Sequence, residues 1–180
     1  MRKLVIALAL AALTAGCAFD GSEKDDMDEK LATLAQRPTI EDIRATYEQM
    51  QSRLRDRLSA EVGPLQWVNR ENFSGAGCGD FPGVDGQKLT LDRWTSEGNL
   101  PDARWDDAMR VVAEVTGDYG FGAPQVVVDR PSDHEITATD SYGAKYLFGT
   151  AANTVLMVRT GCHLPAATHP GTTSPPTGAR

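Results

Sequence analysis

The three cysteines are the residues whose type and position could do chemistry. Cys17 follows an apolar N-terminal run, Cys78 lies among five glycines in FSGAGCGDFPGVDG (residues 73–86), and Cys162 precedes a proline-rich C-terminus. A thiol can carry an acyl chain, ligate a metal, attack a substrate or form a disulfide. The compartment and the neighbouring residues decide between these roles.

Residues 1–16 predict a lipoprotein signal peptide. Arg2 and Lys3 form a positive start, and the apolar run of residues 4–13 is too short to span a bilayer. Small residues then precede Cys17, an order similar to a bacterial lipobox, although Thr14 stands where leucine is usual. We expect a diacylated Cys17 to anchor the mature chain to the extracytoplasmic face of the cell membrane. The alternative is an ordinary cleaved signal with an incidental cysteine.

Composition predicts one folded domain between two polar segments. Residues 17–38 are acidic and lack a periodic apolar face, which indicates a flexible, lipid-anchored linker, although LATLA (residues 31–35) could form a weak extra turn of helix. Residues 39–164 are enough for a single domain, and residues 165–180, rich in Pro and Thr, indicate a disordered tail. The net charge of −7 argues against nucleic acid as a partner.

Periodicity predicts an α+β domain. Apolar residues recur every three or four positions over 40–62 and again over about 102–119, which is typical of two amphipathic helices. Alternating segments at 65–70, 88–94, 125–130, 134–140, 141–149 and 153–161 predict short strands separated by turns. We expect a mainly antiparallel sheet with two helices packed on one face.

The glycine-rich loop does not match a phosphate-binding motif. A dinucleotide fingerprint needs G-x-G-x-x-G, but GAGCGDFPG has its third glycine one place early and Pro82 close behind. A Walker loop needs a Gly-Lys-Ser/Thr ending, which the sequence lacks. We therefore expect no nucleotide cofactor.

An exported chain favours a disulfide between Cys78 and Cys162. In an oxidising compartment, the two cysteines left after lipidation of Cys17 most economically pair with each other. Such a bond would tie the glycine-rich loop to the end of the sheet. Metal ligation and a free thiol remain alternatives, since a catalytic thiol needs a base and His163 is adjacent to Cys162.

A second group of polar residues could ligate a divalent cation. Asp133, His134 and Glu135 are consecutive, and Asp129 is nearby. Adjacent residues of a strand point to opposite faces, so a polar turn and strand start is the favoured interpretation. The sequence also lacks G-x-S-x-G, H-E-x-x-H and S-x-x-K, and we predict no catalytic residues and no metal site.

Several segments occur in an order that is typical of one family. They are TIEDIRATYEQMQSRLRDRLSAEV, GPLQW, GCGD, WDDAMRVVAEVTGDYGFGAP and GCHLPA. Together they resemble the LppA-type lipoproteins of actinobacteria over most of residues 39–165. The most specific matches are Tyr119 with Gly120 and the paired cysteines, carried onto Cys78 and Cys162. The resemblance implies an envelope location and a fold, without an activity.

Two classes of function follow. The favoured one is a non-catalytic surface module, held to the membrane by its lipid and binding a wall component, a protein or a small apolar ligand. Its binding region would be the sheet face or the glycine-rich loop. The alternative is an envelope enzyme that works with Asp80, Asp85 or His163 near the loop around Cys78.

Overall fold

The computed structural model describes residues 20–171, so Cys17, the predicted signal peptide and residues 172–180 lie outside the described part. The helices are α1 (Asp20–Ala35), α2 (Ile40–Glu61), a 3-10 turn η1 (Asp102–Arg104) and α3 (Trp105–Gly117). The strands are β1 (Trp67–Glu71), β2 (Ser74–Gly77), β3 (Gln87–Thr90), β4 (Arg93–Glu97), β5 (Gln125–Arg130), β6 (Asp133–Thr139), β7 (Lys145–Thr150) and β8 (Asn153–Arg159).

The eight strands form one antiparallel sheet. Its main path runs β1-β4-β8-β7-β6-β5, and β3 joins β8 beside β4 while pairing with β2 on its other side. The last four strands follow one another as hairpins, whereas β4 inserts between β1 and β8. The predicted α+β class is confirmed.

Helix α2 is defined by caps at both ends. The side chain of Thr39 accepts a hydrogen bond from the backbone N–H of Asp42 at 3.1 Å, which satisfies one free donor of the first turn. At the other end, the Arg104 guanidinium donates to the carbonyl oxygens of Glu61 and Val62. Arg104 thereby also fixes the start of α3 against the end of α2.

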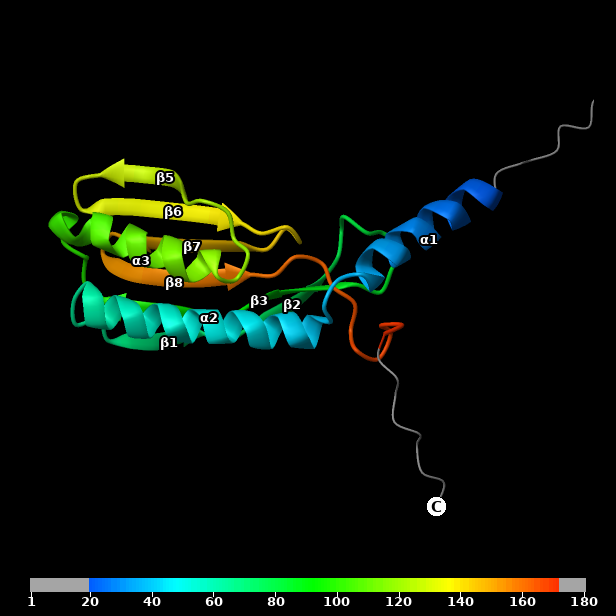
Figure 1. Cartoon of the computed structure of the whole chain (residues 1–180), viewed down its shortest axis with the longest axis horizontal. Coiled ribbons are helices and arrows are strands. Elements are labelled where there is room, and N and C mark those ends of the chain that lie inside the picture. The colour runs from blue at the N-terminus through cyan, green and yellow to red at the C-terminus, as the bar shows by residue number, and fades with distance from the viewer. Residues whose placement is uncertain (1–19, 172–180) are drawn as a thin grey trace, which may run out of the picture.

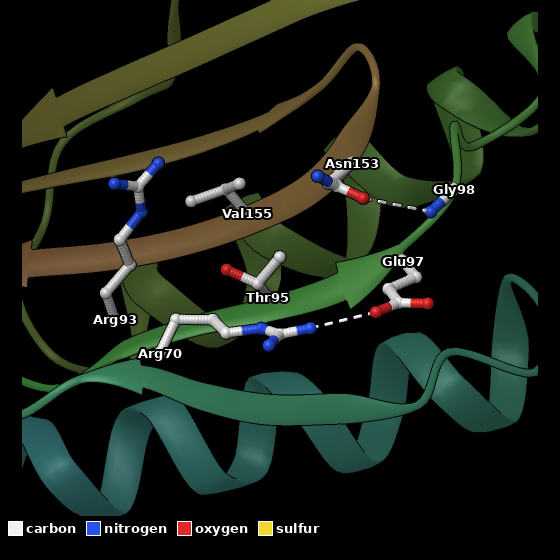
Figure 2. A pocket seen from close by; sticks show the side chains of 7 residues that line it. All are labelled: Arg70, Arg93, Thr95, Glu97, Gly98, Asn153 and Val155. Atoms are coloured by element: carbon white, nitrogen blue, oxygen red, sulfur yellow. Dashed lines mark hydrogen bonds and ion pairs between the residues drawn. The ribbon is translucent and has the colours of Figure 1, made fainter.

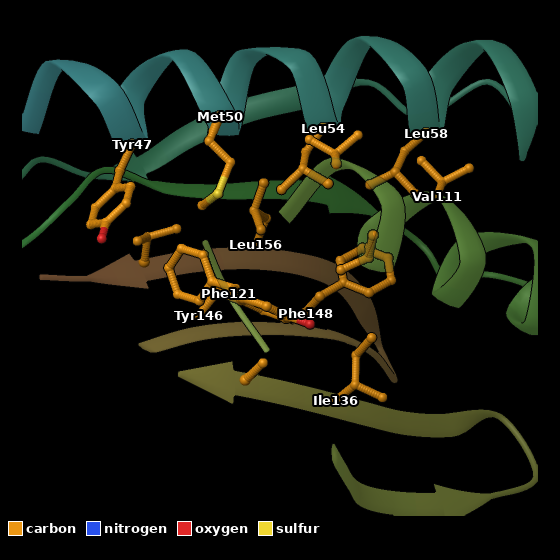
Figure 3. Packing of buried hydrophobic residues seen from close by; sticks show 14 of the residues in the cluster. Tyr47, Met50, Leu54, Leu58, Val111, Phe121, Ile136, Tyr146, Phe148 and Leu156 are labelled. Carbon is orange, nitrogen blue, oxygen red and sulfur yellow. The ribbon is translucent and has the colours of Figure 1, made fainter. Parts of the chain in front are cut away.

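Helices α2 and α3 cover one face of the sheet and enclose the core between them (Figures 1 and 3). Trp105 of α3 stacks on Phe148 of β7, with ring centroids 5.6 Å apart. The side chains of this core include Tyr47, Met50, Leu54, Leu58, Val111, Phe121, Ile136, Tyr146, Phe148 and Leu156. Both predicted helical stripes are therefore core faces.

The first half of the sheet has more strands than predicted. The expected strand at 88–94 is two strands, because the chain turns at Leu91 and Asp92. The Asp92 carboxylate accepts hydrogen bonds from the backbone N–H of Phe73 and from Asn69 Nδ2, both at 2.8 Å. Part of the glycine-rich loop, Ser74–Gly77, is itself strand β2.

The expectation of a flexible linker over residues 17–38 is wrong for α1. This stretch is helical, with an ion pair between Lys30 and Asp26 one turn apart. Leu34, fully buried in a small apolar cluster at its C-terminal end, holds the helix to the domain. The rest of α1 projects away from the sheet (Figure 1). Sixteen residues of helix span about 24 Å.

The described start of the C-terminal tail is also held to the domain. The backbone N–H of Ala166 donates to Glu41 Oε2, and His169 Nε2 lies 2.9 Å from the carbonyl oxygen of Arg37. The expected disordered tail therefore does not begin at residue 165. None of the helices in residues 20–171 combines the length and the apolar composition that a membrane span requires.

Candidate functional site

The sheet face opposite the helices carries an open hollow. Side chains alternate along β8, so Thr154, Leu156 and Val158 are buried under the helices while Val155 and Met157 lie on the other face. The hollow measures about 560 Å³ and is open to solvent. Its lining residues are Arg70, Arg93, Thr95, Glu97, Gly98, Asn153 and Val155 (Figure 2).

Ion pairs position the charged groups around this hollow. Arg70 Nη2 contacts Glu97 Oε1 at 2.8 Å, and Arg93 Nη1 contacts Glu71 Oε1 at 3.3 Å. These pairs are exposed, so they orient the guanidinium groups without adding much stability. Asn153 Oδ1 accepts from the backbone N–H of Gly98 and closes one end of the hollow.

A second hollow of about 200 Å³ continues the first across the sheet. It shares Arg93, Asn153 and Val155 with the larger one and reaches Leu147 and Gly149 of β7. A Cβ atom at Gly149 would lie only 2.9 Å from the carbonyl oxygen of His134, so this position favours glycine. No side chain therefore covers the backbone of β7 at Gly149. Guanidinium, amide, hydroxyl and methyl groups on an open surface suit reversible binding.

His134 joins three elements at the far end of the sheet from α1. Its Nδ1 lies 2.9 Å from Asp129 Oδ1, its Nε2 lies 3.2 Å from Asp102 Oδ1, and its ring stacks on Trp105 at 4.9 Å. The backbone N–H of Ser132, together with His134, holds the pKa of the Asp102 carboxyl below its usual range.

The residues considered and disfavoured as a cation site do not gather around His134. Asp133 and Glu135 line the hollow on the helix-free face, while the His134 ring lies under α3. Asp129 does approach His134, because the two residues are paired across β5 and β6. Among the described residues, no group of three or more His, Cys, Asp and Glu could hold a metal ion. Asp102 carries no signal in the sequence that would link it to His134, because only the tertiary fold brings the two together.

The predicted disulfide between Cys78 and Cys162 is present. Their Cα atoms are 5.8 Å apart. The two cysteines form one buried cluster with Leu34 of α1 and Leu164. Gly86 approaches so closely that a Cβ atom there would lie 3.0 Å or less from each sulfur. At this position glycine is needed for space, and the glycine-rich loop is thereby fixed to the end of β8.

The residues proposed for an envelope enzyme are not brought together. Asp80 pairs with Lys88 on the surface beside the disulfide, in a hollow lined by neither Asp85 nor His163. His163 is fully buried, with Nδ1 2.9 Å from the carbonyl oxygen of Pro38. Burial lowers the pKa of His163 below its ordinary value, because the charged ring would lose its hydration. His163 therefore serves packing and a hydrogen bond inside the domain.

Comparison with known proteins identifies the family. A family model described as "Lipoprotein confined to pathogenic Mycobacterium", LppA, matches residues 18–166. The chain belongs to the LppA family. This membership implies association with a membrane or the cell envelope, and it supplies no reaction. Among curated proteins, none matches the chain.

Two solved structures share the LppA fold seen here. The LppA protein of Mycobacterium tuberculosis is 13% identical, with a TM-score of 0.67 over 86% of this chain and 96% of that one. A DUF4853 family protein from Actinomyces odontolyticus is 20% identical, with a TM-score of 0.55 over 79% of this chain and 80% of that one. Identities this low show the fold alone.

The disulfide makes a measurable contribution to stability. Replacing both cysteines, as Cys78→Ala with Cys162→Ala, opens a loop of 84 residues in the unfolded chain. On the chain-entropy model, the free energy of unfolding should fall by roughly 4 to 5 kcal/mol. Urea unfolding of the variant and of the reduced wild type should give the same midpoint. A loss below about 1 kcal/mol in both would contradict this role.

Burial of His163 predicts a pH dependence of stability. The folded state disfavours the protonated ring, so its contribution is complete above the unfolded pKa of about 6.5 and is lost as pH falls below that value. The free energy of unfolding should therefore decline from about pH 7 to about pH 5, by at most about 1.4 kcal/mol per pH unit. His163→Asn keeps an N–H for the Pro38 carbonyl but cannot titrate. An equal decline in both proteins would exclude His163 as the cause.

Proposed function

We propose that this chain is a lipid-anchored, non-catalytic binding module of the cell envelope. A diacylated Cys17 holds it at the extracytoplasmic face of the membrane, and the helix-free face of the sheet binds a wall component, a protein or a small apolar ligand. Family membership supports the lipoprotein character. The hollow that crosses the uncovered sheet face is the observation that carries the binding role.

The helix-free face has the composition of a recognition surface. Its centre is apolar, with Val155, Leu147 and Met157 half-buried, and arginines stand at its margins. Arginine side chains offer several fixed donors together with an apolar stem, which suits reversible contacts with polar and apolar groups. The two amphipathic helices are both used on the opposite face, so within residues 20–171 no element covers this surface.

Helix α1 supports the anchored arrangement. It begins three residues after Cys17 and spans about 24 Å before Leu34 docks beside the disulfide. A helix of this length would hold the domain at a distance from the lipid instead of letting it collapse onto the membrane. Acidic side chains along α1 also disfavour contact with an anionic membrane surface.

Anchoring at Cys17 is tested by intact-mass analysis of the chain purified from membranes. The wild type should begin at Cys17 and carry the additional mass of a diacylglyceryl group. Cys17→Ala should lack that addition, because it removes the acylated thiol. A mature wild-type chain that begins elsewhere or carries no acyl mass would contradict the anchor.

Binding at the helix-free face is tested by photo-crosslinking of the full lipoprotein in its envelope. A benzoylphenylalanine at Val155 lies in the hollow, and a matched control at Asp106 lies on the exposed side of α3. We expect a discrete adduct from Val155, identified by mass spectrometry, that the Asp106 position does not give. Equal adducts from both positions, or none from Val155, would contradict a binding role for this face.

A further inference from the structure

Two cations face each other on the helix-free face, and no carboxylate within residues 20–171 forms an ion pair with either of them. Lys145 of β7 and Arg159 of β8 are directly opposite in the antiparallel register, and both side chains are exposed. Like charges at such positions destabilise a sheet. The Arg159 side chain donates to the Thr90 hydroxyl at 3.3 Å, a neutral partner that leaves its charge unbalanced.

The next pair on the same face is apolar. Leu147 and Met157 are directly opposite each other, two residues along from Lys145 and Arg159, and they remain half-buried. These four side chains line a hollow of about 180 Å³ together with Tyr146. A cationic pair is therefore followed at once by an apolar pair, in a concave part of the sheet.

The apolar surface continues from this pair into the larger hollows. Leu147 also lines the second hollow, which leads over the bare backbone of Gly149 to Val155. From Arg159 to Val155 the strand advances about 13 Å, at about 3.3 Å per residue. The surface thus has a positive end followed by an apolar strip along β7 and β8. Charged side chains of Arg93, Asp133 and Glu135 line the sides of the second hollow.

The surface that runs from Lys145 and Arg159 to Val155 forms a track along β7 and β8. We propose that this track binds a monomeric amphiphile with one anionic head group and an unbranched apolar chain. The head group, a carboxylate or a phosphate, is held between the Lys145 ammonium and the Arg159 guanidinium. The chain lies over Leu147 and Met157 toward Val155. An anion placed there offsets the repulsion between the two cations, so binding and relief of an unfavourable contact coincide.

The position of the track favours a free amphiphile over an extended peptide or a bilayer. Main-chain hydrogen bonds that hold peptides to sheets form at strand edges, whereas β7 and β8 are interior strands of this sheet. A bilayer surface would lie beyond α1, which extends about 24 Å from the disulfide end. The inference rests on the proposed function in using the same face, and it adds the chemical class of the ligand.

Calorimetric titration with dodecanoate, kept below its micelle concentration, tests the track. The mature chain from residue 17 is used with Cys17→Ser, so that no covalent acyl group competes. Dodecanoate should bind, and dodecanol, with the same chain and no charge, should bind at least about tenfold more weakly, as expected for the loss of a charge-assisted contact. Dodecanol binding as tightly as dodecanoate would overturn the role of the cations.

Two double variants of equal charge change make the test specific. Lys145→Gln with Arg159→Gln should weaken dodecanoate binding by about tenfold or more while leaving the melting temperature unchanged or raised. Arg53→Gln with Arg110→Gln removes the same charge from exposed positions on α2 and α3 and should leave the affinity unchanged. Equal affinities for both double variants would overturn the proposal.

Vesicles and crosslinking separate the remaining outcomes. Binding to phosphatidylglycerol vesicles without binding to monomeric dodecanoate would overturn the monomeric ligand and indicate a membrane contact. A protein adduct at Val155 together with no dodecanoate binding would overturn the amphiphile track and leave the binding module in place. If dodecanoate does not bind and Val155 gives no adduct, the proposed binding function itself is contradicted.

Discussion

The sheet has two broad faces, and within residues 20–171 two amphipathic helices, α2 and α3, pack against it. Both α2 and α3 pack on the same face, where Leu54, Val111 and Phe148 are removed from water. Burial of this apolar surface is the main stabilising contribution to the fold. The opposite face must then remain soluble by itself, and it does so by mixing half-buried aliphatic side chains with arginines and carboxylates.

The disulfide acts on a different part of the molecule from the core. It lies at the end of the sheet where α1, the glycine-rich loop and the chain after β8 meet, outside the main apolar cluster. A small cluster of this kind buries little surface, so a covalent bond adds stability that packing alone would not give. The bond thereby fixes the place where α1, which leads toward Cys17, joins the domain.

Charged side chains are arranged differently on the helices and on the helix-free face of the sheet. Exposed arginines on α2 and α3 are paired with acidic neighbours, as Arg57 is with Glu61 and Glu114. On the helix-free face Arg70 and Arg93 are also paired, whereas Lys145 and Arg159 face each other. The helix-free face thus retains one unfavourable contact between like charges, which an anionic ligand would offset.

The sequence by itself determined the fold class, both core helices and the pairing of Cys78 with Cys162, because periodicity, turn residues and cysteine number are local or countable properties. It could not determine that α1 is helical, since Leu34 becomes a contact only once the disulfide cluster exists. The strand order that places β4 beside β8 is likewise non-local. Only the tertiary structure therefore decided that Asp102 meets His134 and that Lys145 meets Arg159, because contacts between separate segments depend on register and packing.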